Sequence, residues 1–341
     1  MFQKEEKVEK LFSYWLFSSL ILVFLIIVIG GLTRLTNSGL SIIEWELFKG
    51  IFPPMNDMTW SIYFEKYKTI PQYKLLNFNM SLDEFKIIFY WEYIHRILAR
   101  FIGLFFLIPL IFFYFSKKIK KKYIATCTLV FLLIIFQGLV GWYMVKSGLI
   151  HNTTVSHYRL ALHLSIAVII ISTIFWLLKN VNNNEKKIFF KFSKDYLPYQ
   201  FLLIIIFLQI ILGAFVSGLD AGMIYQTWPL MGDSYLPNDT LLINFKNYID
   251  FNNRSLLQFY HRNLAYLIII YLIILSISIY RNRIKHLFKS LNYLLSILVL
   301  QIFLGIFTLL SGLNIFLASA HQISSVLLIF SALNLYFFKV K

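Results

Sequence analysis

The chain has 341 residues, of which 59% are hydrophobic and 14% are charged, and its mean hydropathy is +0.70. This composition is too apolar for a soluble globular domain. The net charge of +16 does not indicate a nucleic-acid-binding protein, because the Lys and Arg residues form short clusters between apolar segments rather than one basic face.

Apolar segments of about 20 residues recur along the whole chain, which is the length that a membrane-spanning helix needs. Their hydropathy predicts an all-α integral membrane protein with eight transmembrane helices. We expect these helices at residues 12–32, 86–115, 122–146, 157–178, 198–218, 254–280, 288–311 and 315–338.

Three connecting segments are rich in lysine and arginine: residues 117–122, 179–194 and 281–289. The positive-inside rule places them in the cytoplasm. Both termini then lie in the cytoplasm, and the long loops 33–85 and 219–253 lie outside. The first ten residues mix acids with bases and lack the pattern of a transit peptide, which favours a bacterial inner membrane.

The sequence also contains an internal repeat that relates its two halves. It predicts two fused, pseudo-symmetric four-helix bundles, at residues 1–180 and 181–341. The repeat takes Gln137, Gly141, Ser147, Gly148 and Leu149 to Gln301, Gly305, Ser311, Gly312 and Leu313, His95-Arg96 to His261-Arg262, His163 to His321, and Asn37, Gly39 and Trp45 to Asp220, Gly222 and Trp228.

Four histidines, His95, His163, His261 and His321, lie in the second, fourth, sixth and eighth predicted helices. Each lies roughly 6 to 9 residues after the start of its helix, which is about 10 Å below the outer boundary. Two imidazoles on facing helices at one level can bind a haem iron from both sides. The four histidines therefore predict one haem site in each half.

A simpler interpretation is that these histidines only form hydrogen bonds between helices. Ionisable groups at membrane depth are costly and usually functional, and two matched pairs favour ligation. Zinc is less favoured, because each half offers two imidazoles and no thiolate, Cys127 being the single cysteine. The other histidines, His151, His157 and His286, are expected to be loop or interfacial residues.

Charged residues distinguish the first half from the second. Glu92 lies one turn before His95, where the second half has Gln258. A carboxylate near a haem edge could accept protons during oxidation of a substituent. Alternatively, Glu92 pairs with Arg96 or Arg100 in a buried ion network, and the two roles are compatible. Arg159 shares a helix face with His163. The repeat places Tyr266 and Leu317 of the second half at the positions of Arg100 and Arg159.

Six segments occur in an order and spacing that cover nearly the whole chain and together resemble the haem A synthase family. The long first loop, with FPPM at 52–55 and MSLDEFKIIF at 80–89, resembles its alphaproteobacterial and mitochondrial branch. The six segments are GGLTRLTNSGLSIIEW at 30–45, FYWEYIHRILAR at 89–100, SHYRLALHL at 156–164, GLDAGMIYQTWPLMG at 218–232, QFYHRNLAY at 258–266 and AHQ at 320–322.

The resemblance implies an oxidoreductase that converts the methyl group at position 8 of haem O to a formyl group, giving haem A for cytochrome oxidase. It places His95 and His163 around the substrate haem, with Glu92 as the essential carboxylate. It makes His261 and His321 the ligands of a permanent haem b. We also expect three arginines at the substrate haem, a lipid environment, an unidentified electron acceptor and haem O synthase as a candidate partner. The arginines are Arg96, Arg100 and Arg159.

Some branches of that family carry cysteine pairs in their outer loops, and this chain has none. A mechanism that needs those thiols is therefore not expected here.

Two other functions fit part of the pattern. A dihaem b-type cytochrome that exchanges electrons with a quinone also needs four histidines, but it does not explain the unequal halves. A transporter fits the repeat. However, the helices lack interrupted midplane segments, and the histidines lie near one surface.

Several outer residues are candidates for caps over the haem pockets, or alternatively pack the loops and the membrane interface. They are Arg34, Asn37, Trp45, Asp220 and Trp228. The glycines of GGLTR and of the Gln-x-x-x-Gly pattern are expected only to let helices approach closely.

Overall fold

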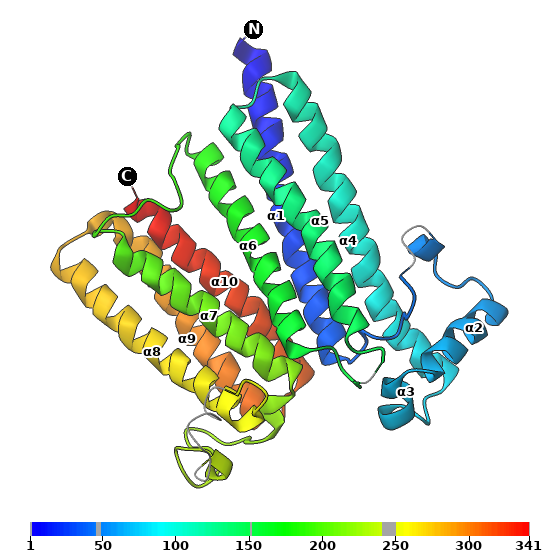
Figure 1. Ribbon diagram of the computed structural model, residues 1–341. Coiled ribbons are helices and arrows are strands. Elements are labelled where there is room, and N and C mark those ends of the chain that lie inside the picture. Colours follow the sequence, from blue (N-terminus) through cyan, green and yellow to red (C-terminus); the bar gives the residue numbers. More distant parts are fainter. Residues whose placement is uncertain (1, 46–48, 151, 241–249, 341) are drawn as a thin grey trace. The chain divides into compact units, whose positions relative to one another are not determined.

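The computed structural model describes residues 2–45, 49–150, 152–240 and 250–340 (Figure 1). Over these ranges the fold is helical, apart from an isolated β-bridge between Met231 and Ser234. Eight of its helices are long and apolar enough to cross a membrane, which confirms the predicted fold class. They are α1 (Phe2–Leu35), α4 (Leu82–Ser116), α5 (Lys121–Lys146), α6 (His157–Asn182), α7 (Leu197–Gly218), α8 (Arg254–Arg281), α9 (Phe288–Leu310) and α10 (Ile315–Lys339).

Two of these helices begin earlier than the sequence predicts, α1 at Phe2 and α4 at Leu82. Hydropathy detects only the apolar part of a helix, whereas a polar cap starts α4. The Ser81 hydroxyl accepts a hydrogen bond from the Glu84 N–H, and the Glu84 carboxylate accepts one from the Ser81 N–H at 2.8 Å. Single 3₁₀ turns lie at Lys49–Ile51, Ala221–Met223, Asn238–Thr240 and Lys285–Leu287.

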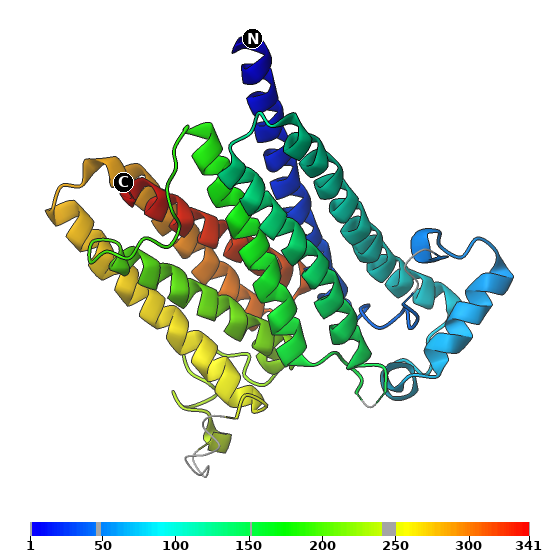
Figure 2. The same ribbon diagram turned by 45° about the horizontal axis from the view of Figure 1, so that its top comes forward.

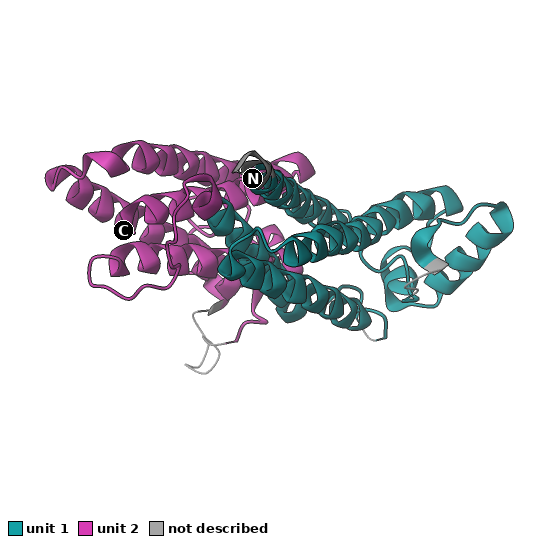
Figure 3. Ribbon diagram, turned by 90° about the horizontal axis from the view of Figure 1, so that it is seen from above, with its two compact units in different colours: residues 1–178 teal, residues 179–341 magenta. Residues whose placement is uncertain are grey.

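The chain divides into two compact units, residues 1–178 and 179–341 (Figure 3). The division lies two residues before the predicted boundary at residue 180. In the first unit, α1 packs against α4, and α4 packs against α5. In the second unit, α7 packs against α8 and α10, and α9 packs against α10. Each unit therefore has the elements of one four-helix bundle.

The segment predicted as a long outer loop contains two helices, α2 (Asp57–Lys68) and α3 (Pro71–Leu76). Figure 2 shows them beside the beginning of α4. One face of α2 buries aromatic side chains against the first turns of α4. These contacts hold the start of α4 in a small subdomain before its apolar span, which we call the outer subdomain after the predicted outer loop that contains it. The buried aromatic residues are Trp60, Phe64 and Tyr67 of α2 and Phe85 and Phe89 of α4.

Candidate functional site

Each of the four predicted ligand histidines lies against a glycine of a neighbouring helix. A Cβ atom placed on any of these glycines would lie 2.9–3.2 Å from an atom of the imidazole, which is close enough that the ring would have to shift. Sequence reasoning assigned these glycines to helix packing and missed that they contact the rings. Measured from such an added Cβ, the pairs are His95 with Gly30 (3.2 Å to Nε2), His163 with Gly141 (3.1 Å to Cε1), His261 with Gly213 (3.2 Å to Cε1) and His321 with Gly305 (2.9 Å to Cε1).

The glycines also set the depth of the rings. Gly30, Gly141, Gly213 and Gly305 each lie five residues before the end of their helix, at Leu35, Lys146, Gly218 and Leu310. At 1.5 Å per residue, every ring faces a point about 7.5 Å inside a helix end. The number of residues from the start of the histidine's own helix, which sequence reasoning used, is a poorer measure of the depth of the ring. His95 lies 13 residues after Leu82, because α4 begins in the outer subdomain.

The two histidines of the second unit have a separation that suits one metal ion between them. The ring centroids of His261 and His321 lie 6.5 Å apart, with an interplanar angle of 77°. A metal–imidazole bond is about 2 Å long, so two imidazoles on opposite sides of one ion have centroids roughly 6 Å apart. In the first unit, His95 lies close enough to His163 for an electrostatic interaction.

The donor set and the partial burial of the rings also suit a macrocycle. Each of the four histidine residues is partly buried. The Nδ1 atoms of His163 and His321 are buried and have no hydrogen-bond partner. Across the part of the chain that the structure describes, no cluster of three or more His, Cys, Asp or Glu side chains could hold a bare ion. Two imidazoles per unit fit a haem, whose ring supplies the remaining iron ligands.

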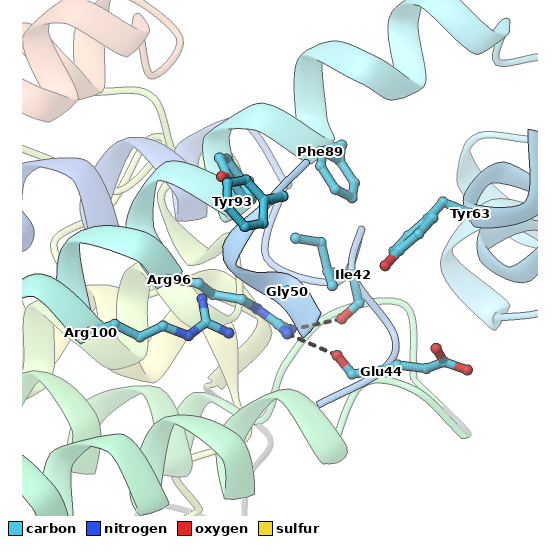
Figure 4. Close-up of a pocket in the computed structure, with 9 residues that line it drawn as sticks. Ile42, Glu44, Gly50, Tyr63, Phe89, Tyr93, Arg96 and Arg100 are labelled. Atoms are coloured by element: carbon cyan, nitrogen blue, oxygen red, sulfur yellow. Dashed lines mark hydrogen bonds between the residues drawn. The ribbon is translucent and has the colours of Figure 1, made fainter. Parts of the chain in front are cut away.

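Glu92 lies at the centre of a buried hydrogen-bond network and is 3% exposed. Its Oε2 accepts hydrogen bonds from the Ser41 hydroxyl and the Ile42 N–H, both at 2.8 Å. Its Oε1 accepts two from Arg96, at 3.0 Å from Nε and 2.6 Å from Nη2. Arg96 also donates to the carbonyl oxygens of Ile42 and Glu44 (Figure 4). Glu92 and Arg96 thus attach the outer loop to α4, as expected for the ion-network alternative.

The second unit contains the same attachment with a different residue. The Gln258 amide donates to the Tyr225 carbonyl oxygen at 2.8 Å. Arg262 donates to the carbonyl oxygens of Tyr225 at 3.0 Å and Leu230 at 3.1 Å. Both units therefore fasten the loop after their first helix to the histidine-bearing helix. They differ in that only the first uses a buried carboxylate.

The other two predicted arginines lie apart from Glu92. Arg100 lines a small cavity beside Arg96 and Tyr93, where α4 meets the outer loop (Figure 4). The Arg159 guanidinium lies 3.7 Å from the centroid of the Tyr143 ring and donates to the Tyr143 carbonyl oxygen at 2.7 Å. Arg159 is therefore anchored to the end of α5.

Sequence reasoning missed two further residues, Trp142 and Lys146. They line a cavity of about 200 Å³ together with Trp45 and Arg96. The repeat contained the signal, because the corresponding positions of α9 are the apolar Ile306 and Leu310. At these two positions, therefore, α5 has a tryptophan and a lysine where α9 has aliphatic residues.

The predicted outer caps divide into two groups. The Trp45 ring lies 5.5 Å from the Arg96 guanidinium and lines the 200 Å³ cavity, so its role as a cap stays a prediction. Asn37 and Asp220 are turn residues, both with a φ of 52° shortly after the ends of α1 and α7. Arg34 donates to the Asn37 side chain at 2.8 Å. Trp228 is 45% exposed.

Of the remaining histidines, His157 is buried at the start of α6, and His286 lies in the turn before α9. His151 lies outside the described residues.

Comparison with known proteins agrees with the motifs. A family model described as "Cytochrome oxidase assembly protein" matches residues 13–333. The haem A synthase of Pelagibacter ubique (strain HTCC1062) is 47% identical over 338 residues, which cover 97% of each chain. That of Rickettsia felis (strain ATCC VR-1525 / URRWXCal2) is 41% identical, covering 96% of this chain and 98% of its own. That of Wolbachia sp. subsp. Brugia malayi (strain TRS) is 40% identical, covering 96% and 97%. The resemblance read from the sequence motifs is confirmed.

Proposed function

We propose that this chain is a haem A synthase. The premise is that it belongs to the family described as "Cytochrome oxidase assembly protein". Its substrate is haem O, whose methyl group at position 8 becomes a formyl group. The names of its relatives support this assignment. The observation that carries it is the pair of glycine-backed imidazoles at matched depth in each unit. A dihaem electron carrier also needs such pairs, but it does not require the charged residues that only the first unit has.

We assign the substrate haem to His95 and His163 and a resident haem b to His261 and His321. The charges of the first unit support this division, because a reacting substrate needs proton acceptors and a resident electron carrier does not. The 6.5 Å separation of the His261 and His321 rings supports ligation of haem b between them. A bound haem b supplies one-electron transfer.

The reaction is an oxidation at carbon with a defined balance. The methyl group takes one oxygen atom from water and loses four electrons and four protons, through a hydroxymethyl group and a hydrated aldehyde. A membrane electron carrier of unidentified structure takes the electrons. The enzyme is thus an oxidoreductase that acts on a CH group.

Glu92 is the carboxylate that we place in this chemistry. It is the buried acid one turn before His95, and its charge is balanced by Arg96. A proton that reaches Glu92 can be shared with the Ser41 hydroxyl, which lies 2.8 Å from Oε2. Arg96, Arg100 and Arg159 supply positive charge at the outer end of this unit, where haem propionates would be stabilised.

We place the chain in a bacterial inner membrane, with both termini in the cytoplasm. The eight apolar helices support a multi-pass membrane protein, and the lysine-rich loops support this orientation. The substrate is lipophilic and can enter from the bilayer. Haem O synthase is a candidate partner, because it makes the substrate.

The test is to express the chain beside a supply of haem O, extract the haems and separate them by chromatography. A formyl-bearing haem is the expected product, and its absence alongside normal haem O levels would contradict the proposal. Replacing His261 or His321 with Ala should remove the stable low-spin haem from the purified protein. An unchanged absorption spectrum in those variants would refute the assignment of haem b.

A further inference from the structure

Three of the four histidine-bearing helices are tied to their glycine-bearing neighbour by a glutamine. Each glutamine lies one turn before the glycine and contacts the facing histidine residue or its ring. We call these contacts amide ties. Gln137 donates to the His163 carbonyl oxygen and Gln209 to the His261 carbonyl oxygen, both at 2.9 Å. The Gln209 amide nitrogen also lies 3.2 Å from Nδ1 and 3.3 Å from Nε2 of the His261 ring. The Gln301 amide nitrogen lies 3.5 Å from the His321 Nε2.

The tie to His321 involves a second polar side chain. The Ser324 hydroxyl donates to the Gln301 Oε1 and also to the His321 carbonyl oxygen. In the second unit, therefore, Gln209 is bonded to the main chain of His261, and Gln301 is bonded to the helix of His321 through Ser324, which lies one turn after it. The first unit differs from this arrangement on one side.

Helix α1 has Ile26 at the position where the other three helices have glutamine, four residues before its glycine. The hydrogen bonds that join α1 to α4 lie at other levels. The Thr33 hydroxyl lies 3.4 Å from the Trp91 carbonyl oxygen, and the Trp15 Nε1 donates to the Phe105 carbonyl oxygen at 3.2 Å. Packing against Gly30 is what holds the His95 ring on this side.

We infer that the amide ties determine how readily each haem leaves, and that His95 is the ligand through which the substrate haem is exchanged. The inference rests on the proposed function, because it presupposes that the histidines bind haem. A hydrogen bond from the neighbouring helix to the main chain of a ligating histidine must break before that part of the helix can move away from the haem. A histidine whose main chain has no such bond can move away from the iron at lower cost. A substrate site must release its product, whereas a resident cofactor must stay.

The distribution of the ties matches this requirement. The unit assigned to haem b has both ties, and the unit assigned to the substrate has one. His163, the tied ligand of the first unit, keeps the haem in place while the His95 side opens. This asymmetry is independent of Glu92 and the arginines, which lie on α4 and α6 rather than on the glutamine-bearing helices.

The experiment measures haem transfer from the purified full-length protein, loaded with haem O, to an excess of apomyoglobin. The wild type should release one haem fast and one slowly. Ile26→Gln should slow the fast phase by about 2-fold to 10-fold, the effect of one added hydrogen bond, with Ile26→Leu as the size-matched control that leaves it unchanged. Gln209→Leu should accelerate the slow phase and broaden the low-spin bands of that haem, without altering the fast phase. The haem of the unaltered unit reports that each variant is folded.

Equal release rates in the wild type, or release that depends on neither Ile26 nor Gln209, would overturn the inference. Such a result together with normal haem A formation would leave the proposed function intact. Failure of the wild type to take up any haem would instead refute the proposed function itself.

Discussion

Replacing Glu92 with glutamine separates its part in catalysis from its part in holding the outer loop. The carboxylate accepts four hydrogen bonds, two on each oxygen. A glutamine can keep its oxygen toward Arg96 and donate from its amide to Ser41, whose hydroxyl then accepts. The Ile42 N–H is left without an acceptor, at a cost of about 1–3 kcal/mol. Gln258 shows that an amide at this position can hold the loop.

Because the loop should stay attached, loss of the negative charge is the main consequence of Glu92→Gln. A positioned proton acceptor typically contributes about 10²-fold to 10⁴-fold to the rate. We therefore expect formation of formyl-bearing haem to fall by at least about 10²-fold. The absorption of haem b should stay at the wild-type level.

The assay is chromatography of extracted haems, normalised to the amount of purified protein. Ser41→Ala is the matched control, because it removes one donor and leaves the carboxylate. It should cost no more than several-fold in rate. Glu92→Gln and Glu92→Ala both leave the Arg96 charge unpaired, but Glu92→Ala also removes every hydrogen bond that the side chain makes to Ser41, Ile42 and Arg96. It should therefore cost about 3–5 kcal/mol and lose both product and stability. Near-normal product from Glu92→Gln would show that Glu92 only attaches the loop.

Two further predictions concern glycine packing and the outer subdomain. Gly305→Ala should displace the His321 ring, because the added Cβ would lie 2.9 Å from Cε1, and should reduce the haem b absorption. Gly138→Ala, whose Cβ would meet nothing within 4 Å, should leave that absorption unchanged and stabilise α5 by up to about 1 kcal/mol. Equal haem loss in both variants would contradict the packing argument. The Tyr67 hydroxyl donates to the buried Gln72 Oε1 at 2.9 Å, and Tyr67→Phe removes this donor. The free energy of unfolding should fall by about 1–3 kcal/mol in a thermal unfolding experiment. An unchanged unfolding midpoint would contradict this.

Hydropathy was sufficient to predict the spanning helices, and the repeat was sufficient to predict which histidines correspond. Both signals are local or periodic, so a single sequence contains them. The outer helix α2 was missed because its exposed face is polar and its mean hydropathy is too low for a membrane span. The start of α2 did have a capping signal, Asn56 followed three residues later by Thr59. The Asn56 side chain accepts a hydrogen bond from the Thr59 N–H, and the Thr59 side chain accepts one from the Asn56 N–H.

The surroundings of Glu92 could not be predicted from the sequence in the same way. Its partners Ser41 and Ile42 lie about 50 residues away in the chain, and nothing periodic connects them with α4. The sequence did offer an ion pair with Arg96 as an alternative to a catalytic acid, from their spacing on one helix face. Coordinates were needed to see that the pair also holds a loop.

The interval of five residues between each glycine that contacts a histidine ring and the end of its helix determines how far that ring lies from the helix end. One residue inserted within that interval would turn the glycine by about 100° and shift it by 1.5 Å, presenting a side chain to the imidazole instead. We therefore expect insertions and deletions to be tolerated beyond residues 35, 146, 218 and 310, but not in the five residues before them. Changes of chain length would thus be confined to the connecting segments.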